Sequence, residues 1–210
     1  MPSPPTAPSS GPLLRALAPA DFLTLGNASC GTGVIFLCLN YLETGPHDPF
    51  LVAAFLLLPL ALVLDLADGM VARRSHRSSA FGADLDSLAD VVSFGVAPAV
   101  LGFTLGLRGV WDAILLCAFV CCGIARLARF NVTAAALSAG TGKVRYYEGT
   151  PIPTSVVIVA LLALAWWRGD IGDALWLGRW RIGPAHVHPL VLLYTASGAL
   201  MVSRIRIPKP

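Results

Sequence analysis

The apolar residues of this chain are gathered into six long runs, and short polar segments separate the runs. Each run has roughly 15 to 23 residues, close to the about 20 that a helix needs to cross the hydrocarbon core of a bilayer. The pattern predicts an all-α polytopic membrane protein with six transmembrane helices. Their expected bounds are Phe22–Leu42, Phe50 to about Ala72, about Asp86 to Leu107, Val110 to about Phe130, Ile152–Trp167 and His188–Val202.

Prolines refine this pattern. Pro98 lies inside the third expected span and predicts a kink, which neighbouring helices tolerate in a membrane bundle. Pro151 and Pro153 stand where the fifth span begins, the end of a helix that accepts proline. The first twenty residues carry six prolines and a single basic residue, Arg15, so they do not resemble a secretory signal. We expect residues 1–20 to form a disordered tail and a short interfacial segment, and residues 21–210 to form one membrane domain.

Composition supports the same class of protein. Of the 210 residues, 56% are hydrophobic and 13% are charged, and the mean hydropathy is +0.72. Six spans of about 20 residues would use some 120 positions. Since only loops and tails remain, no separate soluble catalytic domain fits, and any chemistry belongs to the helices and their connections.

Charge predicts the orientation of the chain. The net charge of +3 is too small to indicate a nucleic-acid partner. If the amino terminus is cytoplasmic, eleven of the fifteen Lys and Arg residues fall on the cytoplasmic side and four on the other. This bias predicts that both termini are cytoplasmic. The segment Arg168–Val187 is then expected to be an outside loop with an aromatic belt rather than a second site.

Cysteine usage excludes two kinds of site. The number of cysteines is odd, all fall in apolar runs and no Cys-x-x-Cys pair exists, so neither a disulfide framework nor a zinc site is indicated. We expect packing roles for Cys30, Cys38, Cys117, Cys121 and Cys122.

Four carboxylates interrupt the apolar pattern at one end of the second and third spans. Asp65 and Asp68 are three residues apart, and Asp86 and Asp90 are four apart, so each pair occupies one face of a helix. A short basic loop joins the two helices, so the two faces can point at each other. One such acid in the hydrocarbon region costs roughly 2.5 to 3.5 kcal/mol, and four cost about 10 kcal/mol unless they are neutralised.

Two interpretations of the acids follow. Converging carboxylates separated by small residues favour a hard cation such as Mg²⁺, and four of them allow two ions about 4 Å apart, as in phosphoryl-transfer sites. Alternatively, some acids pair with the nearby Arg73, Arg74 and Arg77 at the headgroup level. Asp84 lies off the acidic face, so we expect it to be solvated.

Small residues border the acids. Gly69, Ala72 and Gly82 lie on or beside the acidic faces. Absent side chains would let a nucleotide and its phosphates approach the backbone, but small residues also serve close helix packing. Both interpretations stay open.

Written out, the stretch is Asp65-x2-Asp68-Gly69-x2-Ala72-Arg73-x8-Gly82-x3-Asp86-x3-Asp90, and it resembles the signature of the CDP-alcohol phosphotransferase family. Members of that family are six-helix membrane enzymes that transfer a phosphoalcohol from a cytidine diphosphate donor to a second alcohol and release CMP. Further segments resemble the phosphatidylserine synthase branch of the family; they are Thr24–Asn27, Asp86–Pro98, Ala125–Asn131 and Glu148–Pro153. The pair Ala20-Asp21 departs from the Pro-Asn that is frequent in that branch.

The resemblance implies a role for each matched residue. Asp65, Asp68 and Asp86 would hold two Mg²⁺ or Mn²⁺ ions, and Asp90 would share metal binding with proton abstraction as the catalytic base. Arg73 would pair with the donor phosphates. The remaining contacts to the CDP-lipid would come from Asn27, Gly69, Ala72, Ser79 and Gly82. Acceptor contacts would come from Ser93, Arg126, Arg129 and Asn131, although the two arginines are equally explained by membrane anchoring.

The resemblance also implies a reaction and partners. The expected function is transfer of the phosphatidyl group from CDP-diacylglycerol to L-serine by a homodimeric integral membrane enzyme. Glycerol phosphate, inositol phosphate or choline remain possible acceptors within the family. An ion or proton transporter is the competing class, since intramembrane acids also mark ion pathways.

Overall fold

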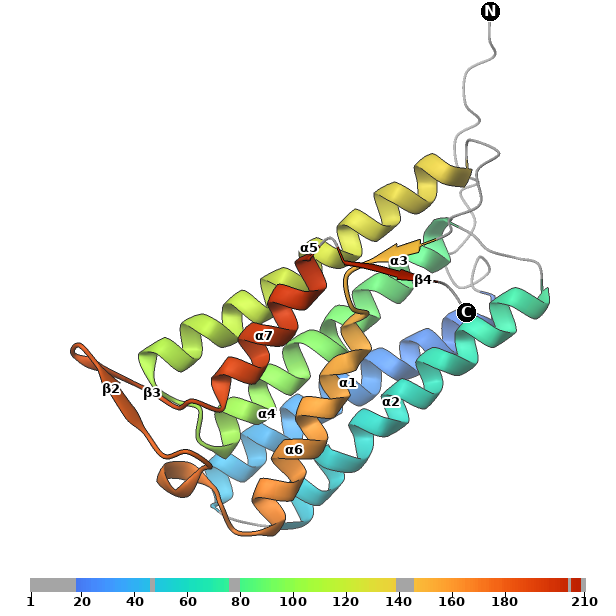
Figure 1. Cartoon of the computed structure of the whole chain (residues 1–210). Coiled ribbons are helices and arrows are strands. Elements are labelled where there is room, and N and C mark those ends of the chain that lie inside the picture. Colours follow the sequence, from blue (N-terminus) through green and yellow to red (C-terminus); the bar gives the residue numbers. More distant parts are fainter. Residues whose placement is uncertain (1–17, 46–47, 76–79, 139–145, 204, 209–210) are drawn as a thin grey trace, which may run out of the picture.

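A computed structural model describes residues 18–45, 48–75, 80–138, 146–203 and 205–208. The described chain is mostly helical, and its long helices run alongside one another in an elongated bundle (Figure 1). The three longest helices are α1 (Pro19–Thr44), α2 (Asp48–Ser75) and α5 (Val110–Ser138). Helix α1 therefore begins just before the expected domain boundary at residue 21, and most of the expected tail lies outside the described residues.

The third expected span begins earlier than the hydropathy pattern indicated and has an irregular middle. Helix α3 (Ala80–Asp90) continues into a π-helix, η2 (Val91–Val96), and then into α4 (Ala97–Leu105). Pro98 lies in the first turn of α4, so the irregular turn directly precedes the proline. Because proline lacks the N–H that a continuous helix requires, a local change of hydrogen bonding next to Pro98 is expected.

The last two apolar segments form shorter helices. After a 3₁₀ turn, η3 (Ile152–Thr154), helix α6 spans Ser155–Trp167, and α7 spans Val191–Val202. Among the described residues, four helical stretches are long and apolar enough to cross a membrane. They are Pro19–Thr44, Pro49–Ala72, Phe81–Leu105 and Val110–Thr133. A count of six crossings stays a prediction.

Two short strand pairs add to the expected all-α fold. Strand β1 (Tyr146–Glu148) pairs antiparallel with β4 (Arg206–Pro208), with Tyr147 opposite Ile207. Strand β2 (Trp180–Ile182) pairs with β3 (Ala185–Val187) in a hairpin that follows a 3₁₀ turn, η4 (Gly172–Ala174). Strands of three residues carry too little alternation for a sequence pattern to reveal them. The two pairs lie at opposite ends of the bundle (Figure 1).

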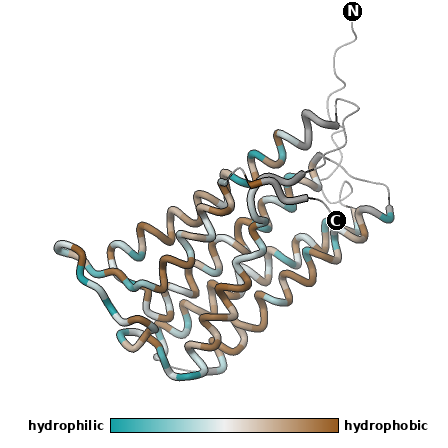
Figure 2. Tube along the Cα trace, in the orientation of Figure 1, coloured by the Kyte–Doolittle hydropathy of each residue, from teal (hydrophilic) through white to brown (hydrophobic). Residues whose placement is uncertain are grey.

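Helix α1 is central to the packing, since it contacts α2, α3, η2 and α4. Its buried side includes Val34 and Cys38, whereas Phe36 on its other side is 61% exposed. Large apolar side chains are likewise exposed on the other long helices, and Figure 2 shows apolar colouring along their middles. Exposed apolar surface over the length of a bundle is typical of lipid-facing helices. The five cysteines are free thiols.

Candidate active site

Three helices position the predicted acidic cluster. Asp65 and Asp68 lie near the end of α2, Asp86 lies on α3, and α1 packs against both helices. Ligand oxygens of Asp65, Asp68 and Asp86 all lie within 4.8 Å of one another. Oxygens bound to opposite sides of one Mg²⁺ are about 4.2 Å apart, so small side-chain adjustments would let all three carboxylates bind one ion.

Asp90 lies one helical turn beyond Asp86 and is 7% exposed. Its Oδ1 accepts a hydrogen bond of 3.3 Å from Nδ2 of Asn27. Asp90 is not among the three acids whose oxygens lie within 4.8 Å of one another, so it borders the cluster.

Helix α1 contributes polar contacts to the acids. The hydroxyl of Thr24 donates a hydrogen bond of 2.6 Å to Oδ2 of Asp68. Sequence reasoning missed Thr24 as a site residue, because its contact with Asp68 joins residues 44 positions apart. The Ser93 hydroxyl of η2 donates to the backbone oxygen of Asn27 at 2.8 Å, next to the residue that holds Asp90.

The close approach of α1 and η2 requires a glycine. A Cβ atom on Gly31 would lie 2.5 Å from Ser93 Oγ and 2.6 Å from Ser93 Cα. Backbone Cα atoms cannot move aside as a side-chain terminus does. Gly31 therefore sets the distance between the helix that carries Asn27 and the π-helix that follows Asp90.

The acids lack a neutralising basic partner among the side chains that the structure describes. The ion pairs there are Arg179–Asp173 and His188–Asp112, and neither involves the acidic cluster. Oδ1 of Asp86 and Oδ1 of Asn27 are buried without a hydrogen-bond partner in the described part of the chain. Buried acceptors without donors fit a site that binds a cation. The alternative was that the acids pair with nearby arginines. Arg74 is exposed and takes part in neither of these ion pairs, and the side chains of Arg73 and Arg77 lie outside the described residues.

A cavity of about 170 Å³ opens beside the acids, and small residues form much of its wall. Gly69, Ala72 and Gly82, the positions that the sequence analysis singled out, all border it. The other lining residues are Ala18, Ala20, Asp21, Thr24, Asp68, Ala83 and Asp86. The cavity thus brings backbone with small or absent side chains next to Asp68 and Asp86, as a site that admits a nucleotide and its phosphates would require.

Asp21 is the third acid in the lining of this cavity, after Asp68 and Asp86. It is 5% exposed, and its Oδ2 accepts a hydrogen bond of 2.7 Å from the backbone N–H of Ala18. In the sequence, Asp21 stands out only as a departure from the family pattern. Its helix-capping position explains why an acid is tolerated there, since carboxylates are favourable at helix N-termini.

Comparison with known proteins identifies the family. A profile of the CDP-alcohol phosphatidyltransferase family matches residues 17–196. The chain belongs to this family.

Relatives with high identity carry related names. The chain is 42% identical over 203 residues to the CDP-diacylglycerol–serine O-phosphatidyltransferase of Saccharomyces cerevisiae, covering 94% of this chain and 73% of that one. It is 37% identical over 161 residues to the archaetidylserine synthase of Methanothermobacter thermautotrophicus, covering 75% and 63% respectively. The serine O-phosphatidyltransferase of Bacillus subtilis is 30% identical over 190 residues, which cover 89% of this chain and 87% of the relative.

Membership in the family agrees with the geometry. CDP-alcohol phosphatidyltransferases depend on divalent metal ions, and this chain gathers three carboxylates that could hold one. The apolar helices and the family together make the chain an integral membrane protein.

The predicted acceptor residues of this phosphatidyltransferase lie apart from the cluster or already have partners. Arg129 donates to the backbone oxygens of Met201, Val202 and Ser203, at 3.3, 3.4 and 3.3 Å. These carbonyls lie at the end of α7, so Arg129 stabilises a helix C-terminus. Arg126 lies over the ring of Phe130, 5.4 Å from its centroid.

Asn131 and Ser93 also make contacts within the protein. Asn131 on α5 donates to Ser87 Oγ at 2.9 Å and to Asp84 Oδ1 at 3.4 Å, which joins α5 to the helix of the acids. Ser93 is fully buried, and its hydroxyl donates to Asn27. Contacts of these residues with the acceptor stay predictions. Ser79 and the side chain of Arg73 lie outside the described residues.

Proposed function

We propose that this chain transfers the phosphatidyl group of CDP-diacylglycerol to L-serine and yields phosphatidylserine and CMP. The observation that carries the proposal is the cluster of Asp65, Asp68 and Asp86 beside a cavity walled by glycine and alanine. The names of the relatives from yeast and Bacillus subtilis support serine as the acceptor.

The residues of the cluster would divide the chemistry between them. Asp65, Asp68 and Asp86 would hold Mg²⁺ or Mn²⁺, with Asp90 contributing to a second ion. Bound ions would neutralise the pyrophosphate and the departing CMP. The bare backbone at Gly69, Ala72 and Gly82 would admit the nucleotide.

Asp90 would act as the base. Its carboxylate would take the proton of the serine hydroxyl while that oxygen bonds to the lipid-side phosphorus and the bond from this phosphorus to the CMP oxygen breaks. Asn27 would orient Asp90 through its 3.3 Å hydrogen bond. Burial of Asp90 within the helices would keep bulk water from competing with serine as the nucleophile.

The proposal includes the place of the chain in the membrane. We infer six crossings, because α6 and α7 pack among the long helices and α6 with η3 covers about 24 Å at 1.5 Å per residue. The distribution of Lys and Arg supports a cytoplasmic site and cytoplasmic termini. A homodimer is part of the proposal on family resemblance alone.

An acceptor screen tests the proposal. Purified full-length protein is supplied with radiolabelled CDP-diacylglycerol, Mn²⁺ or Mg²⁺, and in turn L-serine, glycerol phosphate, inositol phosphate or choline. We expect labelled phosphatidylserine and CMP with serine alone, and loss of product when EDTA removes the divalent ions. A product with another headgroup, and none with serine, would reject the serine assignment while leaving the family chemistry intact.

The transporter alternative predicts a different result. Cation flux through proteoliposomes in the absence of CDP-lipid would support it. The acids of the cluster lie at one end of α2 and α3, and the next buried acid in the described helices, Asp112, lies at the start of α5 at the other end of the bundle. A path for ions would need polar groups between these ends.

A further inference from the structure

A second and larger cavity, of about 420 Å³, lies at the end of the bundle opposite the acidic cluster. Tyr41, near the end of α1, borders this cavity, whereas Thr24, near the start of α1, borders the acidic one. Seventeen residues of helix separate the two side chains, which is about 26 Å at 1.5 Å per residue. The hydrocarbon core of a bilayer is about 30 Å thick, so the second cavity lies near the other membrane interface.

The walls of this far cavity are formed by tightly packed backbone. The loop after α4 meets the segment after α6 at two glycines, because a Cβ on Gly106 would lie 2.8 Å from Cα of Gly172. Gly109 packs in the same way against the backbone oxygen of His186. The volume falls within the range of about 300 to 1,000 Å³ that is typical of ligand sites. The far cavity therefore has closely packed walls and the size of a ligand-binding site.

A buried histidine with one unused nitrogen lines the far cavity. Oδ2 of the fully buried Asp112 accepts hydrogen bonds from Nδ1 of His188 at 2.6 Å and from the backbone N–H of Gly109 at 2.9 Å. Oδ1 of Asp112 accepts from the backbone N–H of His188 at 2.8 Å. A carboxylate only accepts, so Nδ1 of His188 carries a proton and the ring has a fixed orientation.

The other side of the same ring lacks a partner within the part of the chain that the structure describes. His188 is 4% exposed, and its Nε2 is buried with no hydrogen-bond partner among the described residues. Nδ1 of His186, which also lines the cavity, is likewise buried without a hydrogen-bond partner among these residues. Buried polar atoms in native structures are normally paired, so two orphaned ring nitrogens at one cavity indicate a missing ligand.

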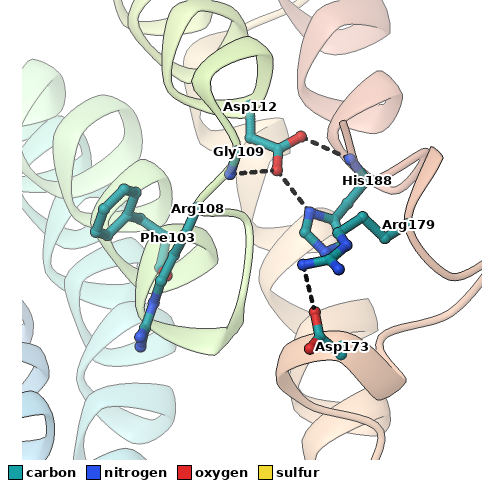
Figure 3. Close-up of polar contacts among 7 residues, drawn as sticks. All are labelled: Phe103, Arg108, Gly109, Asp112, Asp173, Arg179 and His188. Atoms are coloured by element: carbon teal, nitrogen blue, oxygen red, sulfur yellow. Dashed lines mark hydrogen bonds and ion pairs between the residues drawn. The ribbon is translucent and has the colours of Figure 1, made fainter. Parts of the chain in front are cut away.

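The charges around the far cavity favour an anion. Its lining includes Arg108, Arg179, His186 and His188 but one acid, Asp173. In the view of Figure 3, Asp112, His188, Arg179 and Asp173 follow one another, and Arg179 pairs with Asp173 at 3.2 Å. Arg108 is turned to the other side, where it donates to the backbone oxygens of Phe103 and Thr104.

A metal ion fits the far cavity less well. Within the described part of the chain, only the acidic cluster brings three His, Cys, Asp or Glu side chains close enough to bind one ion. The guanidinium of Arg179 in the lining would also repel a cation.

We propose that the far cavity binds the phosphate group of a ligand. His188 donates Nε2–H when its ring is protonated, with Asp112 balancing the charge of the imidazolium, and Arg179 supplies a second charge-assisted donor. The phosphate belongs either to a lipid headgroup of the leaflet at this interface or to free phosphate in solution. This site is independent of the transferase chemistry at the other end of the bundle.

The chain offers a local readout, because it contains four histidines, at positions 47, 76, 186 and 188. Full-length protein labelled with ¹⁵N and ¹³C on histidine alone is titrated in detergent with short-chain phosphatidic acid, with inorganic phosphate, and with short-chain diacylglycerol, which lacks phosphate. We expect saturable shifts of the His188 and His186 ring signals with a phosphate-bearing probe and none with diacylglycerol. A response to phosphatidic acid alone identifies a lipid headgroup, and an equal response to inorganic phosphate identifies the free ion.

Three variants make the test specific. Arg179→Gln should weaken phosphate binding about tenfold or more, because a charged hydrogen-bond donor is lost. His188→Asn keeps an amide donor for Asp112 but removes Nε2, and the His186 response should be lost with it. Arg181→Gln is the matched control, because Arg181 is an exposed arginine close in sequence to Arg179 and is not part of the cavity lining. The affinity of this variant for the phosphate probe should stay within about twofold of that of the unmodified chain.

The proposal is overturned if neither phosphatidic acid nor inorganic phosphate shifts the His188 signals, or if Arg179→Gln binds the phosphate probe as tightly as the unmodified chain. It is also overturned if a titration with Zn²⁺ gives saturable shifts of the His186 and His188 signals and the phosphate probes give none.

Discussion

At the scale of single residues, Asp90 is the proposed base that would activate the acceptor hydroxyl. Nδ2 of Asn27 donates a hydrogen bond of 3.3 Å to the Asp90 carboxyl group. We predict that Asp90→Asn lowers kcat by about 10²- to 10⁴-fold, the usual contribution of a positioned general base. Formation of labelled phosphatidylserine at saturating serine and Mn²⁺ measures this loss.

Asp84→Asn is the control for Asp90→Asn. Asp84 lies on the same helix and is exposed, and it is outside the group of clustered acids. Its substitution should leave kcat within about twofold, because asparagine keeps the oxygen that accepts the 3.4 Å hydrogen bond from Asn131 and the lost charge is on the surface. Equal turnover by Asp90→Asn and the unmodified chain would remove Asp90 from the role of base.

We expect Thr24 to act on the proposed metal site through Asp68 rather than by touching an ion. Its hydroxyl holds Oδ2 of Asp68 at 2.6 Å, so Thr24→Val frees a predicted ligand to rotate. Partners that orient metal ligands typically contribute about 10- to 100-fold in affinity. We predict a rise of that size in the Mn²⁺ concentration for half-maximal activity, and recovery in Thr24→Ser. A lower Tm with unchanged Mn²⁺ dependence in Thr24→Val would mean that Thr24 serves packing alone.

At the scale of elements, the contact between α1 and η2 helps to position Asp90, the proposed base, next to the proposed metal ligands. We predict that Gly31→Ala destabilises the protein by about 1 to 3 kcal/mol, as overpacking in a closely packed core does, because its Cβ would meet the backbone of Ser93. Thermal unfolding in detergent measures the loss. Activity should fall as well, since α1 carries Asn27 and Thr24.

Gly33→Ala is the matched control on the same helix. A Cβ on Gly33 would lie 3.1 Å from Cδ1 of Leu57, the end of a flexible side chain that can move. Its Tm should therefore stay close to that of the unmodified chain. Equal destabilisation by the two substitutions would show that α1 and η2 have room to separate.

Local spacing made the acidic cluster predictable, because residues three and four apart on a helix always share a face. Contacts made across the fold were not predictable in the same way. Thr24 reaches Asp68 over 44 residues, and the Asp112–His188 pair joins residues 76 apart. The early start of α3 escaped the hydropathy pattern because Asp84 and Asp86 interrupt the apolar residues of its first turns. Short strands such as β2 and β3 carry no periodicity from which to infer them.

At the scale of the whole molecule, the two cavities define two ends of the bundle, and the proposed topology assigns them to opposite sides of the membrane. Arg74 lies at the end of α2 beside the acidic cluster, and Leu177 lies in the segment beside the far cavity; both are exposed. We predict that, in a cysteine-free background in intact cells, a membrane-impermeant maleimide labels Leu177→Cys and leaves Arg74→Cys unlabelled until the membrane is opened. This asymmetry follows from the eleven-to-four distribution of basic residues. Labelling of Arg74→Cys alone would invert the topology, and the far cavity would then face the cytoplasm. Labelling of both positions in sealed cells would contradict a bundle that places its two cavities on opposite sides of the bilayer.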